Sequence, residues 1–281
     1  MSVLTVENLC KFYPSFTLDH VSFDLTPGKI TGLIGRNGAG KSTTLNALFQ
    51  FVHPDSGTVR FFGQEFSRHE LDIKRRVGYV SGGVDYYSGK KLRTITGVTR
   101  RFYPTWDEEA YHRYLSRFQL DEKKTPAQLS AGMRVKYALT LALSHRAELL
   151  ILDEPTSGLD PVSREDLLEE FMALCDQGVT ILFSTHITSD LDKCADDLIY
   201  IKEGKILAES SLDAFAARYR LAELSREQLA NVDRARLVGC RRSRSGVSAL
   251  VRAEDAAALP VSAAPADLDA IMVHLEGRED E

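Results

Sequence analysis

Residues 35–42 read Gly-Arg-Asn-Gly-Ala-Gly-Lys-Ser, which fits the pattern G-x-x-x-x-G-K-[ST]. Glycines at this spacing let the backbone curl so that successive N–H groups face one anion. The ammonium group of Lys41 suits terminal phosphates, and the hydroxyl of Ser42 suits a divalent cation. Because an apolar run (residues 30–34) precedes the loop and a helical pattern (residues 43–49) follows it, the segment predicts a phosphate-binding loop, or P-loop, rather than a chance glycine turn.

A second group of chemically capable residues follows two apolar runs further along the chain. Residues 149–152 are all Leu or Ile and are followed by Asp153 and Glu154. Residues 179–185 are followed by His186. The first run predicts a buried parallel strand with carboxylates at its C-terminal edge, where open α/β sheets place ligands. There Asp153 would support Mg²⁺ and Glu154 would polarise an attacking water, unless both are simply solvated acids.

Two further motifs identify a family. Residues 129–133 read Leu-Ser-Ala-Gly-Met before an apolar helical stretch, and residues 157–160 read Ser-Gly-Leu-Asp directly after the acidic pair. In this order, with the P-loop before them and His186 after them, the motifs resemble those of the ATP-binding cassette (ABC) ATPases over roughly residues 2–210. The resemblance implies an α/β fold: a RecA-like P-loop NTPase core with an antiparallel β subdomain and a helical subdomain.

The resemblance also implies a role for each matching residue. Tyr13 matches the aromatic residue that stacks on adenine, and Ser130 and Gly132 match the signature residues that grip the γ-phosphate held by an opposite subunit. His186 matches the switch histidine, and Asp160 matches an aspartate that lies across the dimer interface. Together with catalytic Glu154 and His186 and the metal site Ser42 and Asp153, the expected ATP contacts are Tyr13, Gly35, Asn37, Gly38, Ala39, Gly40, Lys41, Ser42, Thr43, Ser130, Gly132 and Asp160.

The chain departs from the family pattern in two places. Ala131 and Met133 replace a glycine and a glutamine of the usual signature L-S-G-G-Q, and methionine lacks the hydrogen bonds of glutamine. The glutamine expected after residues 77–81 is missing, and Gly82-Gly83 stands there. Asp85 could replace its oxygen ligand, or the glycines could mark only a hinge. With residues 101–107, these departures resemble the YtrB-type, bacitracin- and lantibiotic-exporter ATPases.

Composition limits the class of protein. The 281 residues are 43% hydrophobic and 27% charged, with a net charge of −5, so we expect a globular protein and no nucleic-acid partner. No apolar run approaches the ~20 residues that span a bilayer, and the first residues lack the basic start of a signal peptide. The four cysteines have no paired spacing, which fits a reducing cytoplasm and disfavours a metal site. Together with these observations, the resemblance to transporter ATPases implies a cytoplasmic chain that reaches the inner membrane face through a separate permease subunit.

The predicted organisation is an ABC ATPase domain at residues 1–210, with its helical subdomain at about 85–145, and a small α+β accessory domain at residues 211–281. In the first domain, residues 3–8 and 21–25 predict early strands, and Asp107 is a suitable N-cap for a helix over residues 108–118.

The accessory domain has weaker signals. Residues 212–219 predict a helix, residues 237–240 and 247–252 a hairpin, and residues 256–266 a loop. Asp267 is a suitable N-cap for a last helix.

The predicted function is ATP hydrolysis by a head-to-tail homodimer or heterodimer, with ATP and Mg²⁺ between the subunits, that drives an exporter of peptide, antibiotic or another small amphiphile. Two alternatives stay open at this point. One is a soluble ABC ATPase of translation or DNA repair, although the chain has a single cassette and no coiled-coil heptads. The other is a regulatory module that binds ATP without turnover, which the missing glutamine at Gly82-Gly83 allows.

Overall fold

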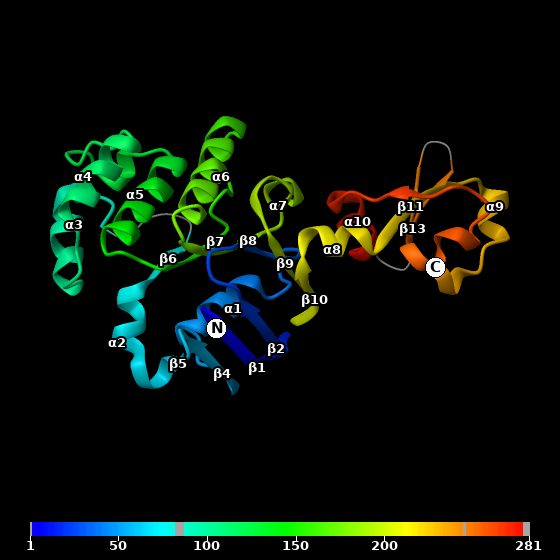
Figure 1. Ribbon diagram of the computed structural model, residues 1–281, viewed down its shortest axis with the longest axis horizontal. Helices are drawn as coiled ribbons and strands as arrows, with labels where there is room; N and C mark the ends of the chain where they lie inside the picture. The colour runs from blue at the N-terminus through cyan, green and yellow to red at the C-terminus, as the bar shows by residue number, and fades with distance from the viewer. Residues whose placement is uncertain (1, 82–86, 244–245, 278–281) are drawn as a thin grey trace. The chain divides into compact units, whose positions relative to one another are not determined.

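The computed structural model describes residues 2–277 except 82–86 and 244–245. The chain forms two compact units. The N-terminal unit comprises Met1–His186 and Cys194–Glu209, and the C-terminal unit comprises Ile187–Lys193 and Ser210–Glu281. The short segment directly after His186 therefore belongs to the C-terminal unit, and each unit is described by itself below (Figure 1).

An antiparallel sheet of order β2-β1-β4-β5 forms one layer of the N-terminal unit. Its strands are β1 (Leu4–Tyr13), β2 (Phe16–Leu25), β4 (Ser56–Phe61) and β5 (Gln64–Glu65). The strands predicted at 3–8 and 21–25 are real but too short. Register shifts after Val6 and Leu9 break the two-residue alternation that marks a strand, so the sequence pattern ends before the pairing does.

A second sheet, of order β10-β9-β3-β8-β7-β6, is the centre of the unit. Its strands are β3 (Ile30–Ile34), β6 (Val77–Ser81), β7 (Leu149–Asp153), β8 (Thr180–Thr185), β9 (Asp197–Lys202) and β10 (Lys205–Ser211). The β6–β7, β7–β8, β8–β3 and β3–β9 pairs are parallel. Strands buried on both faces read as continuous apolar runs, which is why β3, β7 and β8 were predictable.

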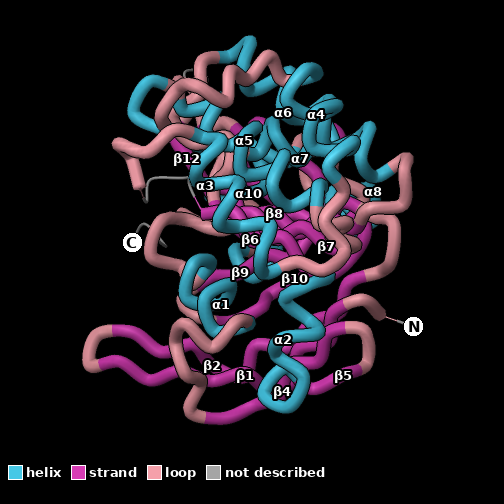
Figure 2. The backbone as a smooth tube through the Cα atoms, turned by 90° about the vertical axis from the view of Figure 1, so that its left-hand side faces the viewer, coloured by secondary structure: helices cyan, strands magenta, loops and turns pink. Residues whose placement is uncertain are grey.

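The helices of this unit are α1 (Lys41–Leu48), α2 (Phe66–Arg76), α3 (Leu92–Thr99), α4 (Glu108–Arg117), α5 (Ala131–Ser144) and α6 (Pro161–Cys175). The α1, α2, α5 and α6 helices contact strands of the central sheet, with α1 on the side of the antiparallel sheet (Figure 2), whereas α4 packs against α5. Asp107 caps α4 as predicted, because its side chain accepts a hydrogen bond from the Ala110 N–H at 2.9 Å. The apolar core between the two sheets includes Phe49, Phe61 and Phe66, whose rings lie within 6 Å of one another.

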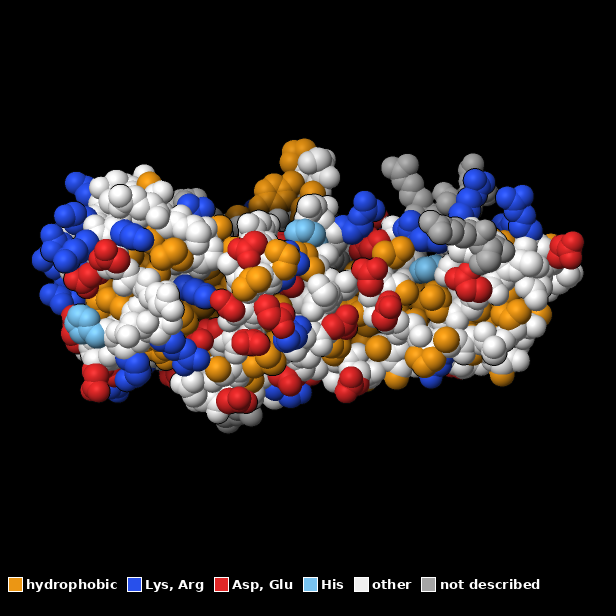
Figure 3. Space-filling model, turned by 90° about the horizontal axis from the view of Figure 1, so that it is seen from above, with side chains coloured by type: hydrophobic (Ala, Val, Ile, Leu, Met, Phe, Trp, Pro, Cys, Tyr) orange, Lys and Arg blue, Asp and Glu red, His pale blue; other side chains and the backbone are white. Residues whose placement is uncertain are grey.

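The helical part of the N-terminal unit, α3 to α5, is joined to α2 through His145, which directly follows α5. The His145 ring stacks on Tyr103 with ring centres 3.9 Å apart, and its Nδ1 lies 3.1 Å from the carbonyl oxygen of Arg75. Burial lowers the pKa of His145 to about 4, so the ring is neutral and its Nδ1–H donates to that carbonyl. Basic side chains gather at the end of the unit that carries α3 and α4 (Figure 3).

The C-terminal unit holds a four-stranded antiparallel sheet of order β12-β13-β11-β14. Its elements are α7 (Thr188–Cys194, of which residues 188–193 belong here), α8 (Leu212–Ala217), β11 (Tyr219–Leu224), α9 (Arg226–Ala230), β12 (Leu237–Arg242), β13 (Val247–Arg252), β14 (Ala264–Pro265) and α10 (Leu268–Leu275). The hairpin and the last helix with its Asp267 cap are confirmed. The helix predicted at 212–219 ends at Ala217, and the predicted loop at 256–266 contains part of a 3-10 helix and β14.

No helix within the described ranges is long and apolar enough to cross a membrane.

Candidate nucleotide site

The P-loop connects the end of β3 to the start of α1, as the sequence predicted. Gly38 and Gly40 take positive φ angles of 86° and 112°, which side chains resist. A Cβ on Gly35 would collide with the carbonyl oxygen of Ile201, so glycine allows the loop to pass close to β9. The first turn of α1 carries no acidic residue, so the N-terminal N–H groups and the helix dipole present positive potential there.

Lys41 lies inside this loop and is only 5% exposed. Its Nζ donates to the carbonyl oxygens of Gly35 at 2.7 Å and Arg36 at 3.3 Å. It also forms an ion pair with Glu154 Oε1 at 3.2 Å. A buried ammonium needs such partners, and phosphate oxygens can replace them.

Asp153 ends β7 beside the start of α1. Its Oδ1 accepts hydrogen bonds from the hydroxyl of Ser42 at 3.1 Å and from the hydroxyl of Ser184 at 2.6 Å. A carboxylate and a hydroxyl in contact are a suitable pair of oxygen ligands for Mg²⁺. The parallel register explains the meeting, because Asp153 lies opposite Ser184 on β8 and opposite Ser81 on β6.

Glu154 follows at once and is held on three sides. Its N–H donates to Ser184 Oγ at 2.9 Å, Oε1 faces Lys41, and Oε2 lies 2.9 Å from His186 Nδ1. Its φ of 49° is a left-handed conformation that costs a non-glycine residue about 1–3 kcal/mol, so the surroundings fix it against strain. The side chain is 23% exposed and that of His186 is 41% exposed, so a water molecule can reach the pair.

Ser184 was not singled out from the sequence, although it holds both carboxylate residues. The signal was weak: two hydroxyl residues, Ser184 and Thr185, at the end of an otherwise apolar strand. Tyr79 on β6, whose phenol interacts with the charge of Asp153, was also not singled out from the sequence. Its hydroxyl lies 3.1 Å from Asn46 Oδ1, and burial, with the charge of Asp153 second, raises the pKa of Tyr79 to about 12.

The signature residues form a second group at the N-termini of α5 and α6. Ser130 caps α5 by accepting from the Met133 N–H at 3.2 Å, and Asp160 caps α6 by accepting from the Ser163 N–H at 3.0 Å. A Cβ placed on Gly132 would lie 3.6 Å from the side chains of Leu159 and Ser163, which is ordinary contact. The N-terminus of α5 has a neutral cap and no acidic residue in its first turn, so it suits an anion, whereas the Asp160 carboxylate already occupies the N-terminus of α6.

Tyr13 lies at the end of β1 with 38% of its surface exposed. Its ring centre is 6.4 Å from that of Phe16, and Lys11 Nζ is 5.8 Å from the Tyr13 ring centre. Phe16 in turn packs against the P-loop, because its ring would be 2.9 Å from a Cβ on Gly40. The two rings thus place an exposed aromatic surface next to the loop, while Gly82, Gly83 and Asp85 lie outside the described residues.

The other predicted P-loop residues, Asn37, Ala39 and Thr43, follow the same turn into α1. The Ala39 N–H donates to the Arg36 carbonyl oxygen at 3.1 Å, and the Ala39 carbonyl accepts from the Gly204 N–H at 2.9 Å. These bonds fix the loop to itself and to the β9–β10 turn.

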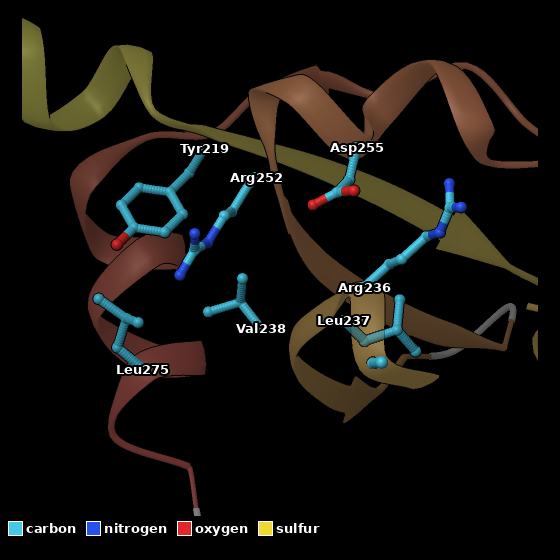
Figure 4. A pocket seen from close by; sticks show the side chains of 8 residues that line it. Tyr219, Arg236, Leu237, Val238, Arg252, Asp255 and Leu275 are labelled. Carbon is cyan, nitrogen blue, oxygen red and sulfur yellow. The ribbon is translucent and has the colours of Figure 1, made fainter. Parts of the chain in front are cut away.

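The C-terminal unit has a pocket of about 490 Å³ that shares no residue with this site. Val238, Leu237 and Leu275 form its apolar lining, and Tyr219 and Arg252 lie beside Val238 (Figure 4). Arg252 Nη1 lies 3.7 Å from Glu254 Oε1, which is too long for a strong hydrogen bond.

Comparison with known proteins identifies the family. The family described as "ABC transporter" matches residues 18–157. Among curated relatives, BcrA, a bacitracin transport ATP-binding protein of Bacillus licheniformis, is 32% identical over 78% of this chain and 73% of its own length. SrtF, a lantibiotic transport ATP-binding protein of Streptococcus pyogenes, is 34% identical over 75% of this chain and 92% of its own length.

Solved structures give the same result for the fold. A structure described as the ATP-binding subunit of an ABC transporter superposes with a TM-score of 0.68 at 29% identity, covering 76% of this chain and 91% of that chain. A nucleotide-free ATP-binding cassette superposes with a TM-score of 0.65 at 24% identity, covering 75% of this chain and 92% of that chain, which shows the shared fold. The P-loop, the acidic strand end and these likenesses lead to one conclusion: the chain belongs to the ATP-binding, ATP-hydrolysing subunits of ABC transporters.

Proposed function

We propose that the carboxyl edge of the central sheet binds and hydrolyses ATP through Lys41, Ser42, Asp153, Glu154 and His186. The observation that carries this proposal is the convergence of these side chains from the start of α1 and the ends of β7 and β8. On nucleotide binding, Lys41 would exchange its contacts with Gly35, Arg36 and Glu154 for phosphate oxygens.

Ser42 and Asp153 would hold Mg²⁺, since both oxygen ligands lie within hydrogen-bond distance of each other. The ion would neutralise phosphate charge when bound. Ser184 fixes the Asp153 carboxylate through its hydroxyl and thereby orients the oxygen that faces Ser42.

Glu154 would accept a proton from the attacking water, and His186 would orient the carboxylate and the water. The water oxygen forms a bond to the γ-phosphorus while the bond from that phosphorus to the leaving oxygen of ADP breaks, which gives ADP and phosphate. Release of Lys41 to the phosphates frees Oε1 of Glu154 for this task, whereas Oε2 keeps its contact with His186.

The signature group would complete the nucleotide site of a second copy or of a homologue. Ser130 and Gly132 lie at the start of α5, next to the start of α6. The N-terminus of α5 remains suitable for an anion. A head-to-tail dimer would place ATP between one P-loop and the other signature, so that two charged surfaces close only around the triphosphate. Met133 cannot supply the side-chain hydrogen bonds of the usual glutamine, so this contact would rest on Ser130 and the backbone.

The partner would be a separate membrane permease at the cytoplasmic face. BcrA and SrtF are named for the transport of bacitracin and of a lantibiotic, which supports a peptide antibiotic or a similar amphiphile as cargo. Val98 and Phe102, at the helical end of the N-terminal unit, are 50% and 70% exposed and would suit contact with a permease loop.

The substitution Gly132→Ala tests the paired site. Because the added methyl group makes only ordinary contacts within the chain, folding and ATP binding by the single chain should persist. Hydrolysis should fall about 10-fold or more if the glycine approaches a γ-phosphate from the other subunit. Gly97→Ala in α3 is the matched control, since a Cβ there meets nothing within 4 Å. Equal turnover by the two variants would contradict a signature role for Gly132.

A further inference from the structure

A thiol, a carboxylate and an imidazole meet between β1 and β2, outside the residues assigned to ATP. Cys10, Asp19 and His20 each offer one ligand atom, and these atoms all lie within 4.8 Å of one another. Cys10 is 2% exposed, whereas the His20 side chain is 70% exposed, so the group reaches from the protein interior to the solvent.

A β-bulge creates this grouping. The register pairs Leu9 with Val21 and Lys11 with Leu18, so Asp19 and His20 of β2 oppose the single residue Cys10 of β1. A bulge turns neighbouring side chains toward one face, and His20 takes a left-handed φ of 49° to do so. The local fold, rather than sequence spacing, therefore assembles the three side chains.

The three groups already interact. His20 Nδ1 lies 2.5 Å from Asp19 Oδ1, and the His20 N–H lies 3.3 Å from Cys10 Sγ. Asp19 Oδ2 also pairs with Lys205 Nζ at 3.1 Å. These contacts hold the Asp19 carboxylate beside the imidazole and close to the thiol.

We propose that Cys10, Asp19 and His20 bind one Zn²⁺ or a similar borderline-soft divalent cation, with water as the fourth ligand. Thiolate and imidazole ligands select such ions, whereas Mg²⁺ prefers oxygen ligands alone, so this site differs from the Ser42 and Asp153 pair. Zinc bonds of about 2.0–2.3 Å in a tetrahedron require the Nδ1 and Oδ1 atoms to separate to about 3.4 Å. The exposed His20 ring has room for that movement.

Binding would have a defined charge balance. The cation displaces the thiol proton of Cys10, which goes to solvent, and the Nδ1 proton that His20 shares with Asp19, which moves through solvent to Nε2 so that the ring binds in its neutral form. Lys205, which is 61% exposed, would leave Asp19 for water because its positive charge opposes the ion. The site is also close to the nucleotide loop: the Asp19 N–H donates to the Gly204 carbonyl, and the Gly204 N–H donates to the Ala39 carbonyl, each at 2.9 Å.

The test uses the untagged full-length protein under reducing conditions, without nucleotide or Mg²⁺. Co²⁺ is added first as a spectroscopic probe, and Zn²⁺ affinity is then measured by calorimetry. We expect one ion per chain and a near-ultraviolet thiolate-to-cobalt charge-transfer band. Cys10→Ser should remove the band, and His20→Asn should weaken Zn²⁺ binding about 10-fold or more, because asparagine tolerates the left-handed backbone but lacks the imidazole.

Matched controls locate the ion. Cys240→Ser removes a half-buried thiol of the C-terminal unit, and His112→Asn removes an exposed imidazole of α4, so both should bind Zn²⁺ as the wild type does. Asp153→Asn should also keep the cobalt band, which separates this site from the nucleotide-linked metal. The proposal is wrong if the wild type gives no thiolate band, or if the band survives in Cys10→Ser protein whose melting temperature matches the wild type.

Discussion

At the carboxyl edge of the central sheet, Lys41, Glu154 and His186 direct their polar atoms at one another. In the C-terminal unit, buried His274 and the exposed Arg241 direct theirs at backbone carbonyl oxygens instead. His274 Nδ1 lies 2.7 Å from the Ala270 carbonyl and Nε2 lies 3.2 Å from that of Ser248, while Arg241 Nε donates to Val273 at 2.8 Å. These contacts tie α10 to its sheet.

This difference distinguishes side chains that can exchange a partner for a ligand from side chains that stabilise the fold. A side chain bonded to another charged side chain can exchange that contact for a ligand at little cost, because the ligand supplies the same chemistry. A side chain whose only partners are buried carbonyls cannot leave without an unpaired polar group, which costs about 1–3 kcal/mol. Lys41 differs because it contacts the Glu154 carboxylate as well as the Gly35 and Arg36 carbonyls. On this basis the N-terminal unit carries the chemistry, and the described part of the C-terminal unit carries mainly architecture.

The largest effect is expected from Glu154→Gln. The amide keeps the shape but cannot accept the proton from water, so we expect hydrolysis to fall about 10²-fold or more while ATP still binds. ATP-dependent dimers should then accumulate and be visible by light scattering. Glu169→Gln, on the exposed face of α6, is the control. Turnover at the wild-type rate in Glu154→Gln would assign the base elsewhere.

Two histidines of the N-terminal unit differ in the same way, because His145 stabilises the fold whereas His186 faces the nucleotide site. The pKa of His145 is about 4 in the folded chain against an ordinary 6.5, so between these values only the unfolded chain takes up the proton. Stability is therefore complete above about pH 6.5 and falls as the pH drops toward 4. From pH 7.5 to 5 the loss assigned to His145 is about 2 kcal/mol.

Urea unfolding of the wild type and of His145→Phe at both pH values measures this loss. Phenylalanine keeps the stacking on Tyr103 but does not titrate. Between pH 7.5 and 5 the free energy of unfolding of His145→Phe should therefore fall about 2 kcal/mol less than that of the wild type. Parallel pH curves for the two proteins would show that His145 is not kept neutral by the fold.

Lys41→Ala tests whether the buried lysine is reserved for a ligand. The substitution removes the buried cation of the P-loop and leaves the exposed Arg36, so the ATP dissociation constant should rise about 10-fold or more. Isothermal calorimetry measures it, with Lys74→Ala in α2 as a control for loss of a positive charge. An unchanged affinity would mean that Lys41 serves only the Gly35 and Arg36 carbonyls.

The smallest effect is expected in the C-terminal unit. Asp267 Oδ1 caps α10 by accepting from the Ala270 N–H at 2.7 Å. Asp267→Ala removes this cap and should lower the free energy of unfolding by about 1 kcal/mol. Asp267→Asn keeps the cap without the charge and should lose only a few tenths. ATP hydrolysis by both variants should stay within about twofold of the wild type. A large loss of turnover with an intact fold would give the C-terminal unit a part in the chemistry.

The nucleotide-site residues at the carboxyl edge of the central sheet could be predicted because short sequence motifs encode them. A glycine loop between a strand and a helix, and two acids at the end of an apolar run, fix where Lys41 and Asp153 must lie once the strands are parallel. Ser184 could not be singled out in this way, since one serine in a buried strand has no periodic signal. Its contact with Asp153 exists only because of the β7–β8 register.

Elements without a clear period were missed for related reasons. The α2 helix is strongly charged and bends at His69, whose φ of −128° is not helical, so no regular apolar stripe marks it. Residues 212–219 are rich in helix formers, yet the pairing of Tyr219 with Arg252 draws the chain into β11. The Cys10, Asp19 and His20 group depends on a bulge, which spacing alone does not encode.

In the head-to-tail dimer that we propose, each nucleotide site is completed by the signature group of another subunit. Lys41→Ala protein and Gly132→Ala protein, each with strongly reduced turnover alone, should be mixed in equal amounts at an ATP concentration well below the dissociation constant of Lys41→Ala and assayed for ATP hydrolysis. A mixed homodimer then contains one site with an intact P-loop and an intact signature, so activity should recover to about a quarter of the wild-type rate. If the wild-type chain turns over ATP alone and the mixture shows no recovery at any ratio, the paired-site account is contradicted.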